Sequence, residues 1–242
     1  MNILSGVAWG FITARGGSKS IPLKNIVLVK DKPLLCYCID AAAKAKSLDR
    51  IICSTDHEKI AEVALARGVE ILERPEHLCG DLVASLDVVL DGVSTLARKY
   101  GSLPEIVVLI QPTSIFLKAE HIDTCVESLL NTPKAGSSQA VIKVPHQFHA
   151  HNQRIMAEEG CDIWFAFPKE REAGHNKQTK PTFYTYGNLI VTRTKSLLND
   201  KTLFASPSIP IVIPSQYAYD LDGPGDIALA ELMIEKNIVI LD

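Results

Sequence analysis

The segment ARGGSKSIPLKN at residues 14–25 combines glycines with positive charge directly after an apolar stretch. Residues 7–13 predict a buried strand, and ligands of open α/β sheets bind beyond the carboxyl ends of strands. Gly16 and Gly17 allow the backbone to approach a ligand closely and to turn N–H groups towards it. Three cations lie within ten residues: Arg15, Lys19 and Lys24. This combination indicates a binding site for a triphosphate.

Two commoner phosphate-binding motifs are absent from the chain. It contains neither GxxxxGK[ST] nor the dinucleotide fingerprint GxGxxG. A dehydrogenase of the dinucleotide-binding type is therefore disfavoured. The alternative for the glycine-rich segment is a solvated turn without a ligand, and its place after the first predicted strand favours a site.

A pair of acidic residues lies near the end of the chain, in YDLDGPGD at residues 219–226. Asp220 and Asp222 are two positions apart, so an extended segment points both carboxylates to one side. Hard oxygen ligands at this spacing suit Mg²⁺ bound to substrate phosphates. The alternative is a pair of acids at the start of a helix, where Asp226 is expected to supply first-turn charge.

Composition limits the class of protein. The chain has 242 residues, of which 47% are hydrophobic, and its net charge is −3. This charge gives nucleic-acid binding no global support. The six cysteines form no CxxC pair, which favours buried, reduced thiols in a cytoplasmic protein. We expect no signal peptide and no membrane span, because no apolar run approaches the required ~20 residues.

Short apolar runs alternate with helical patterns. We predict strands at 7–13, 50–54, 69–72, 106–110, 139–144, 188–192 and 238–241, and helices at 34–46, 58–67, 83–98, 119–130 and 224–236. This alternation predicts a Rossmann-like, mostly parallel sheet with helices on both faces. We expect one domain over 1–242, interrupted by a polar insertion at 145–183.

The glycine-rich segment resembles the N-terminal signature of the CMP-sialic acid synthetases (acylneuraminate cytidylyltransferases), commonly ARGGSKGIPxKN. Eleven of twelve positions fit, and Ser20 replaces a glycine. The resemblance implies a fold of the nucleotidyltransferase type that binds CTP and Mg²⁺. The implied CTP-binding residues of this segment are Ala14, Arg15, Gly16, Gly17, Ser18, Lys19, Lys24 and Asn25.

Further segments resemble the same family in order. ICSTDHEKIAEVA at 52–64 matches a second-strand segment, in which we expect Asp56 to cap the following helix. ERPEHLCGDLVASLDVVL at 73–90 resembles the border of the cytosine pocket, which implies that Asp81 and Ser85 bind CTP. LIQPTS at 109–114 implies that Gln111 contacts the acceptor, although its last residues could form only a turn. The acids at 219–231 imply metal binding by Asp220 and Asp222, with Arg15, Lys24 and Asp222 as catalytic residues.

The acceptor segment departs from the family. PTFYTYGNLIV at 181–191 stands where relatives have a segment like PxxFRPNGAIY, so Thr185 replaces an arginine. Another family arginine corresponds to Lys177, and a third to Leu117, where Lys118 could replace the charge. The implied acceptor-binding residues are Gln111, Lys177, Tyr184 and Asn188. The implied acceptor is sialic acid or a related nonulosonic acid; the alternatives are a KDO-like sugar, a phosphonate, or a catalytically inactive nucleotide-binding relative.

The insertion contains the pattern HxxHxH at His146, His149 and His151. This spacing could bind a transition metal, and the alternative is a surface or acceptor-contacting loop. In the family this region forms a dimerisation arm that reaches over the partner's active site. The resemblance therefore implies a homodimer.

Overall fold

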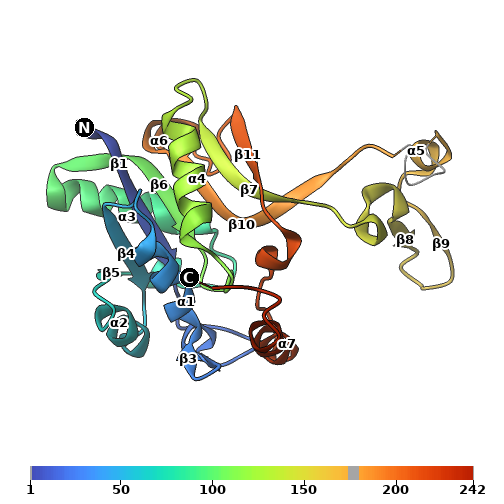
Figure 1. The fold of residues 1–242 in the computed structure, drawn as a ribbon, viewed down its shortest axis with the longest axis horizontal. Coiled ribbons are helices and arrows are strands. Elements are labelled where there is room, and N and C mark those ends of the chain that lie inside the picture. Colours follow the sequence, from blue (N-terminus) through green and yellow to red (C-terminus); the bar gives the residue numbers. More distant parts are fainter. Residues whose placement is uncertain (1, 174–179, 242) are drawn as a thin grey trace.

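The computed structural model describes residues 2–173 and 180–241, which form a central sheet with helices on both faces and a projecting arm (Figure 1). The sheet has the strand order β11-β7-β10-β6-β1-β4-β5. Its strands are β1 Asn2–Thr13, β4 Arg50–Thr55, β5 Glu70–Glu73, β6 Ser102–Ile110, β7 Ser137–Lys143, β10 Tyr184–Arg193 and β11 Ser208–Val212. β10 runs antiparallel to β6 and β7, and the other neighbours are parallel. The predicted Rossmann-like, mostly parallel sheet is confirmed.

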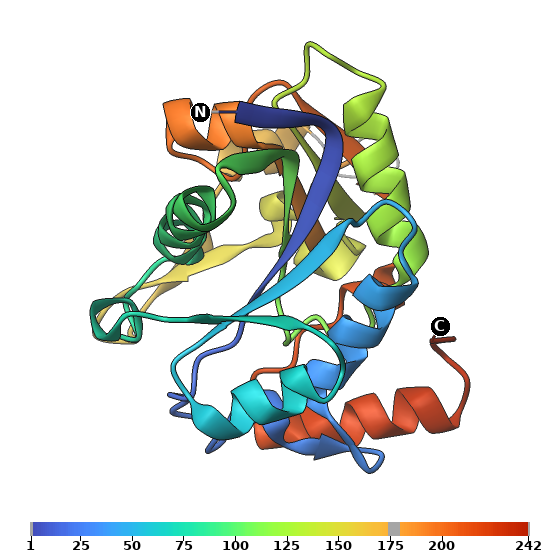
Figure 2. The same cartoon turned by 90° about the vertical axis from the view of Figure 1, so that its left-hand side faces the viewer.

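Two layers of helices cover the sheet (Figure 2). α1, α2 and α4 pack in one core cluster with one face, whereas α3 and α6 pack in a second cluster with the other. α7 packs in a third cluster beside the loops that follow β1 and β6. The helices are α1 Leu34–Lys44, α2 Glu58–Leu65, α3 Ser85–Tyr100, α4 Ala119–Leu130, α5 Pro168–Ala173, α6 Thr194–Asp200 and α7 Pro224–Glu235.

β1 is an interior strand of the sheet, between β6 and β4, and its second half is buried on both faces. Ala8 and Ile12 belong to the core cluster of α1, α2 and α4, and Trp9 and Phe11 belong to the cluster of α3. This is the alternation of side chains expected of a central strand, whose sequence reads as one continuous apolar run. The burial fixes the position at which β1 ends and the glycine-rich segment begins.

Most predicted elements exist with shifts of a few residues at their ends, but the predicted strand at 238–241 is wrong. These residues follow α7 without regular structure. Val239 is buried and Leu241 is partly buried against the α7 cluster. The N–H of Ile240 donates to the Tyr217 hydroxyl at 3.2 Å instead of to a strand. Packing against the α7 cluster, and not pairing in a sheet, therefore explains why this segment is apolar.

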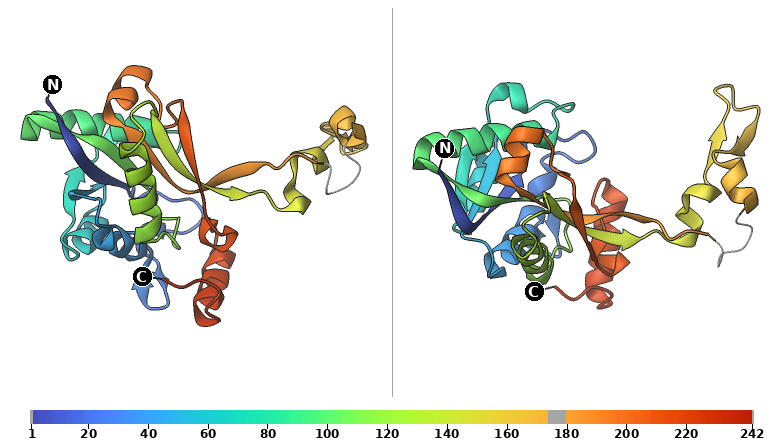
Figure 3. Two further views of the ribbon diagram at one scale, coloured as in Figure 1. Left: turned by 45° about the horizontal axis from the view of Figure 1, so that its top comes forward. Right: turned by 90° about the horizontal axis from the view of Figure 1, so that it is seen from above.

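The polar insertion is an arm that leaves the body between β7 and β10 (Figures 1 and 3). Near its end a hairpin pairs β8, Arg154–Met156, with β9, Ile163–Phe165. The side chains of Met156, Ile163 and Trp164 are exposed. The arm thus presents apolar groups away from the core of its own chain.

The cysteines are unpaired, as predicted. Cys36, Cys38, Cys53 and Cys125 are buried, Cys79 is partly buried and Cys161 is exposed on the arm. Burial raises the pKa of the Cys53 thiol to about 12 and that of Cys125 to about 11, so both stay protonated near neutral pH. In the described part of the chain, none of the helices combines the length and apolar character that crossing a membrane requires.

Close packing of α3 on the sheet depends on Gly92. A Cβ at this position would overlap the ring of Phe11, which is fully buried. We expect Gly92→Ala to lower the free energy of unfolding by about 1–3 kcal/mol, the usual cost of overpacking a core. Gly225→Ala, in the first turn of α7, is the matched control because a Cβ there meets nothing within 4 Å. Urea unfolding measures both, and equal stability of Gly92→Ala and the wild type would contradict the packing argument.

Candidate active site

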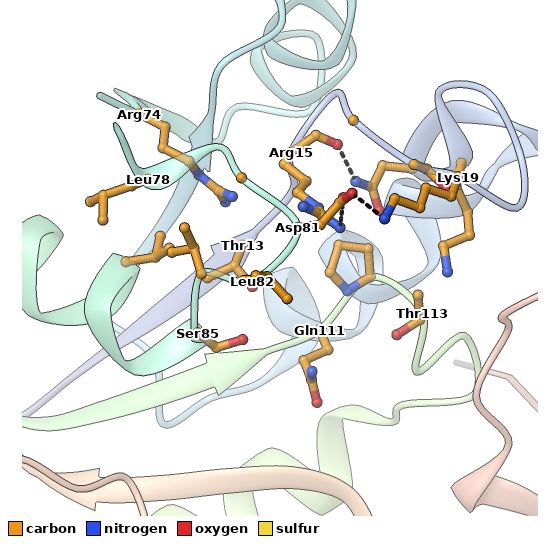
Figure 4. A pocket seen from close by; sticks show the side chains of 18 of the residues that line it. Thr13, Arg15, Lys19, Arg74, Leu78, Asp81, Leu82, Ser85, Gln111 and Thr113 are labelled. Carbon is orange, nitrogen blue, oxygen red and sulfur yellow. Dashed lines mark hydrogen bonds and ion pairs between the residues drawn. The ribbon is translucent and has the colours of Figure 1, made fainter. Parts of the chain in front are cut away.

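A cleft of about 560 Å³ opens at the carboxyl ends of β1 and β6 (Figure 4). The loop after β1 forms one wall, and the loop between β5 and α3 forms the other. Gln111 lines the cleft together with most of the residues that were predicted to bind CTP. These are Arg15, Gly17, Ser18, Lys19, Lys24, Asn25, Asp81 and Ser85. Ala14 and Gly16 are outside this lining. The two segments singled out from the sequence therefore meet across one cavity.

The start of the glycine-rich loop is fixed by its own backbone. The N–H of Ala14 donates to the Ser54 carbonyl at 3.0 Å, which extends the pairing of β1 with β4. The N–H of Gly16 donates to Asp56 Oδ1 at 2.7 Å, so it is bonded within the protein and does not face a ligand as expected. A Cβ on Gly16 would lie 2.8 Å from the His57 ring, so a side chain would displace the loop.

The prediction that Asp56 caps α2 is wrong. The cap is His57, whose Nδ1 accepts the N–H of Lys59 at 3.2 Å. Asp56 lies one residue earlier, and its carboxylate holds Gly16. Asp56 and His57 are adjacent acceptors in the sequence. In the structure His57 caps the helix, whereas Asp56 accepts the N–H of Gly16.

Asn25 also holds the glycine-rich loop. Its Nδ2 donates to the Arg15 carbonyl at 2.8 Å, and its side chain is largely buried. Because this amide group is bonded to the backbone beside Arg15, its role is to keep the arginine at the cleft. Asn25 also lines the cleft, and its predicted contact with CTP stays a prediction.

Charged side chains bridge the two walls of the cleft. Arg15 Nη2 lies 2.9 Å from Asp81 Oδ1, and Lys19 Nζ lies 2.8 Å from Asp81 Oδ2 (Figure 4). Lys19, followed by Arg15, lowers the pKa of the Asp81 carboxyl. Each pair contacts solvent and is therefore weak. A polyanion that enters the cleft can replace Asp81 as the partner of both cations.

Arg74 lines the same cleft and was not singled out from the sequence. Only 6% of it is exposed, and its Nη2 donates to the Ser54 carbonyl at 2.8 Å. Burial lowers the pKa of its guanidinium, which nevertheless stays charged. A buried cation at a polar cleft is a strong feature of an anion site. Its only sequence signal was its place at the start of the segment 73–90.

The acid pair lies beside the loop but outside the lining of the cleft. Lys24 Nζ joins Asp222 to the loop, at 3.3 Å from Asp222 Oδ1 and 3.2 Å from the Leu221 carbonyl oxygen. Desolvation by neighbouring atoms raises the pKa of the Asp220 carboxyl most, and the charge of Asp222 raises it further, whereas a hydrogen bond with Thr113 lowers it. The acid pair thus lies next to Lys24 of the loop.

Asp226 carries first-turn charge of α7, as predicted. Its Oδ2 accepts the N–H groups of Asp222 at 2.9 Å and Gly223 at 2.7 Å. These bonds, of which that from Gly223 has the larger effect, lower the pKa of Asp226. The carboxylate therefore fixes the turn that carries Asp222.

Gln111 lines the cleft, and a tyrosine that was not predicted from the sequence lies beside it. The Tyr186 hydroxyl lies 3.5 Å from Gln111 Oε1, and its ring packs edge-on against Phe204. Burial raises the pKa of Tyr186, and the nearby charge of Asp220 raises it further. Gln111 starts a turn that is closed by the Ser114 N–H at 3.1 Å, so the expected turn is present.

Two other predicted acceptor residues, Asn188 and Tyr184, are not among the residues that line the cleft. Asn188 is fully buried, and its Nδ2 lies 3.1 Å from His121 Nδ1 and 2.9 Å from the Tyr217 carbonyl oxygen. Tyr184 is exposed on the strand that leads into the arm, paired with Lys143. Lys177 lies outside the described residues. An ungapped comparison could not foresee that the register of β10 shifts between Tyr186 and Ile190.

Lys118 does not bring its charge to the cleft. Leu117 before it is buried in the core beside α4. Lys118 Nζ lies 3.7 Å from Glu120 Oε2 and 5.7 Å from the ring centre of Tyr217. The replacement of the family arginine at this position is therefore uncompensated by Lys118.

Two histidines of the insertion, His149 and His151, pack through their rings. His149 and His151 are buried, with ring centres 4.8 Å apart, and both contact Phe183. His149 Nε2 lies 2.9 Å from the Pro181 carbonyl oxygen. Within residues 2–173 and 180–241, no group of three or more His, Cys, Asp or Glu side chains is arranged to hold a metal ion. These contacts give the pattern HxxHxH a structural role in the arm.

Comparison with known proteins defines the class that this fold and cleft represent. Residues 10–159 match the family model described as cytidylyltransferase. The chain is 30% identical over 230 residues to CMP-N,N'-diacetyllegionaminic acid synthase of Legionella pneumophila, which covers 93% of this chain and 95% of the relative. The chain belongs to the cytidylyltransferase family, and its resemblance to the CMP-sialic acid synthetases is confirmed.

Further relatives differ in length. N-acylneuraminate cytidylyltransferase of Escherichia coli is 27% identical over 93% of this chain, which spans 52% of that protein. Pseudaminic acid cytidylyltransferase of Campylobacter jejuni is 24% identical, with 93% of this chain and 95% of the relative covered. A solved CMP-2-keto-3-deoxy-manno-octonic acid synthetase in complex with CTP aligns with a TM-score of 0.67 at 11% identity, over 95% of this chain and 99% of that chain, which shows a shared fold.

Asp220 and Asp226 predict opposite effects of the same substitution on stability. The raised pKa of Asp220 means that its ionised form is disfavoured in the fold, so Asp220→Asn should raise the free energy of unfolding at pH 7. The lowered pKa of Asp226 means the reverse, so Asp226→Asn should lower it. The stabilisation by Asp226 is complete above its ordinary pKa near 4 and is lost as the pH falls through its lower folded value.

Both effects are expected to stay within about 1 kcal/mol, since these side chains contact solvent. Urea unfolding of the two variants at pH 7 and pH 3 measures them, and each variant serves as the matched control of the other. A change of the same sign in both variants at pH 7 would contradict the assignment.

Proposed function

We propose that the chain transfers CMP from CTP to an acidic sugar, either sialic acid or a related nonulosonic acid, with release of pyrophosphate. The observation that carries this proposal is the cationic cleft after β1, where Arg15, Lys19 and Arg74 converge. Relatives named as synthases or cytidylyltransferases of legionaminic, neuraminic and pseudaminic acids support an acceptor of this class. The replaced arginine at Thr185 favours a related acid over sialic acid itself.

In the proposed reaction, a hydroxyl oxygen of the acceptor forms a bond to the α-phosphorus of CTP. The bond from this phosphorus to the bridging oxygen of the β-phosphate breaks, pyrophosphate leaves, and the hydroxyl proton passes to solvent. Arg15, Lys19 and Lys24 hold the triphosphate and compensate the charge of the leaving group. Positioning and charge neutralisation supply most of the catalysis in such displacements. Gln111, backed by Tyr186, orients the acceptor.

Asp220 and Asp222 are the residues that would hold Mg²⁺. Their oxygen donors suit this ion, and Asp222 lies beside Lys24 of the glycine-rich loop. Two carboxylates leave further coordination positions to water and substrate phosphates, as is usual for Mg²⁺. When bound, the ion would neutralise charge that develops on the phosphates.

The activity is tested by measuring pyrophosphate release with each of the four common nucleoside triphosphates and a panel of acceptors. The panel comprises N-acetylneuraminic, legionaminic and pseudaminic acids, KDO and a phosphonate. We expect release with CTP and a nonulosonic acid. Pyrophosphate release with KDO or the phosphonate alone would show that the acceptor belongs to that other class. CTP binding without pyrophosphate release for any acceptor would favour a catalytically inactive relative.

Asp222→Ala is expected to reduce turnover at least about 100-fold, the usual cost of losing a group that stabilises charge in the transition state. Arg15→Ala should reduce the rate with every acceptor. Both side chains are partly or largely exposed, so the circular dichroism spectrum and the melting temperature should change little. Near-normal turnover of Asp222→Ala would contradict its proposed role.

We infer further that the arm, within an insertion at 145–183, joins two copies of a single-domain chain into a homodimer. Its exposed apolar groups, among them Met156 and Trp164, have no core of their own to cover them, which supports an interface. The free cysteines support a reducing, cytoplasmic location.

Trp164→Glu should convert the dimer into a monomer, because it introduces a charge into the apolar hairpin. Light scattering coupled to size-exclusion chromatography measures the mass. Leu65→Glu is the matched control, since Leu65 is exposed on α2 and away from the arm. A monomeric wild type, or a dimer that survives Trp164→Glu but not Leu65→Glu, would contradict the assignment of the interface to the arm.

A further inference from the structure

Ser20 stands where the resembling family has a glycine, and the proposed reaction gives it no role. Its hydroxyl donates to the Asp222 carbonyl at 2.5 Å, across 202 positions of sequence. The same residue lines the cleft beside the other side chains of the glycine-rich loop. One hydroxyl thus joins the loop that binds phosphate to the segment that carries the acid pair.

The backbone N–H and carbonyl groups of Leu221 and Asp222 all form hydrogen bonds. The Leu221 N–H donates to the Thr113 carbonyl at 3.0 Å, and the Leu221 carbonyl accepts from Lys24 at 3.2 Å. The Asp222 N–H donates to Asp226 at 2.9 Å. The Asp222 carbonyl takes the bond from the serine, so two consecutive residues have both of their backbone polar groups fixed by other parts of the chain.

The side chain of Asp222 is held less firmly than its backbone. It is 80% exposed, and its contact with Lys24 is a single ion pair at 3.3 Å. The direction in which its carboxylate points therefore depends on the orientation of its peptide units. The hydroxyl of Ser20 fixes the peptide unit that follows Asp222.

We propose that Ser20 is a positioning residue that holds Asp222 in register with the phosphate-binding loop. A divalent cation on the acid pair then meets the phosphates held by the loop without movement of either segment. This inference rests on the proposed function for the identity of the ligands. The serine supplies a tether between the two segments that a glycine at this position cannot supply.

The test compares Ser20→Ala, which removes the hydroxyl, with Ser20→Thr, which keeps it. A single net hydrogen bond corresponds to a roughly two- to tenfold change in an equilibrium constant. We expect Ser20→Ala to weaken Mn²⁺ binding in the presence of CTP by this factor, measured by electron paramagnetic resonance. The Mg²⁺ concentration for half-maximal rate should rise by the same factor, while the KM for CTP at saturating Mg²⁺ changes less. Ser20→Thr should restore both values.

Ser94→Ala is the matched control, because Ser94 also donates to a carbonyl, that of Leu90 at 2.8 Å, on the exposed surface of α3. It should leave the Mn²⁺ affinity unchanged. Ser20→Gly restores the residue of the resembling family, which makes it a second variant expected to fold. Wild-type Mn²⁺ affinity in both Ser20→Ala and Ser20→Gly would overturn the proposal.

The two hypotheses fail in different ways. If the wild type releases no pyrophosphate from CTP, the proposed function fails, whereas the Mn²⁺ affinities of the variants still test the tether. If the wild type is active and Ser20→Ala keeps its metal dependence, the tether fails alone. An equal loss of rate in Ser20→Ala, Ser20→Thr and Ser20→Gly at saturating metal would also overturn the tether. Ser20→Thr keeps the hydroxyl and should therefore keep the wild-type rate.

Discussion

The parallel pairing of β1 with β4 and β6 is the constraint on which the candidate site depends. Parallel strands end at the same edge of the sheet, so the loops that follow them must share that edge. The loop after β1 brings Arg15, the loop after β4 brings Asp56, and the loop after β6 brings Gln111. Burial of β1 on both faces fixes where this edge lies. The chemistry of the cleft therefore depends on apolar contacts made by residues that never touch a ligand.

Electrostatic balance is the second feature of the cleft. Each cation at this edge has a carboxylate nearby: Asp81 bridges two of them, Asp222 contacts Lys24, and Asp56 affects the pKa of Arg74. Without such partners, like charges gathered in one place would destabilise the fold. A triphosphate can take over the exposed cations, since surface ion pairs are weak. Arg74 differs because it is buried and bonded to the Ser54 carbonyl, so its position is set before any ligand arrives.

The sequence was sufficient to predict six of the seven strands of the sheet and the glycine-rich loop, because both depend on local patterns, whereas β11 was not predicted. Continuous apolar runs mark buried parallel strands, and the glycines and cations are adjacent in the chain. Arg74 and Tyr186 were missed because their importance arises from burial beside residues distant in sequence. Asn188 was assigned to the acceptor from an ungapped resemblance, which does not show the change of register inside β10. The apolar end of the chain read as a strand, although packing against α7 explains its composition.

The structure provides fewer of the predicted acceptor residues than of the predicted CTP-binding residues. Gln111 lines the cleft with Tyr186 beside it, whereas Lys118 contacts Glu120 and Asn188 is buried. The arm carries further basic groups, among them Arg154 and Lys180, but it extends away from the body of its own chain (Figure 3). Its polar groups therefore lie far from the cleft that they would serve within one chain. This geometry supports the proposed homodimer, in which the acceptor site would be shared between two copies.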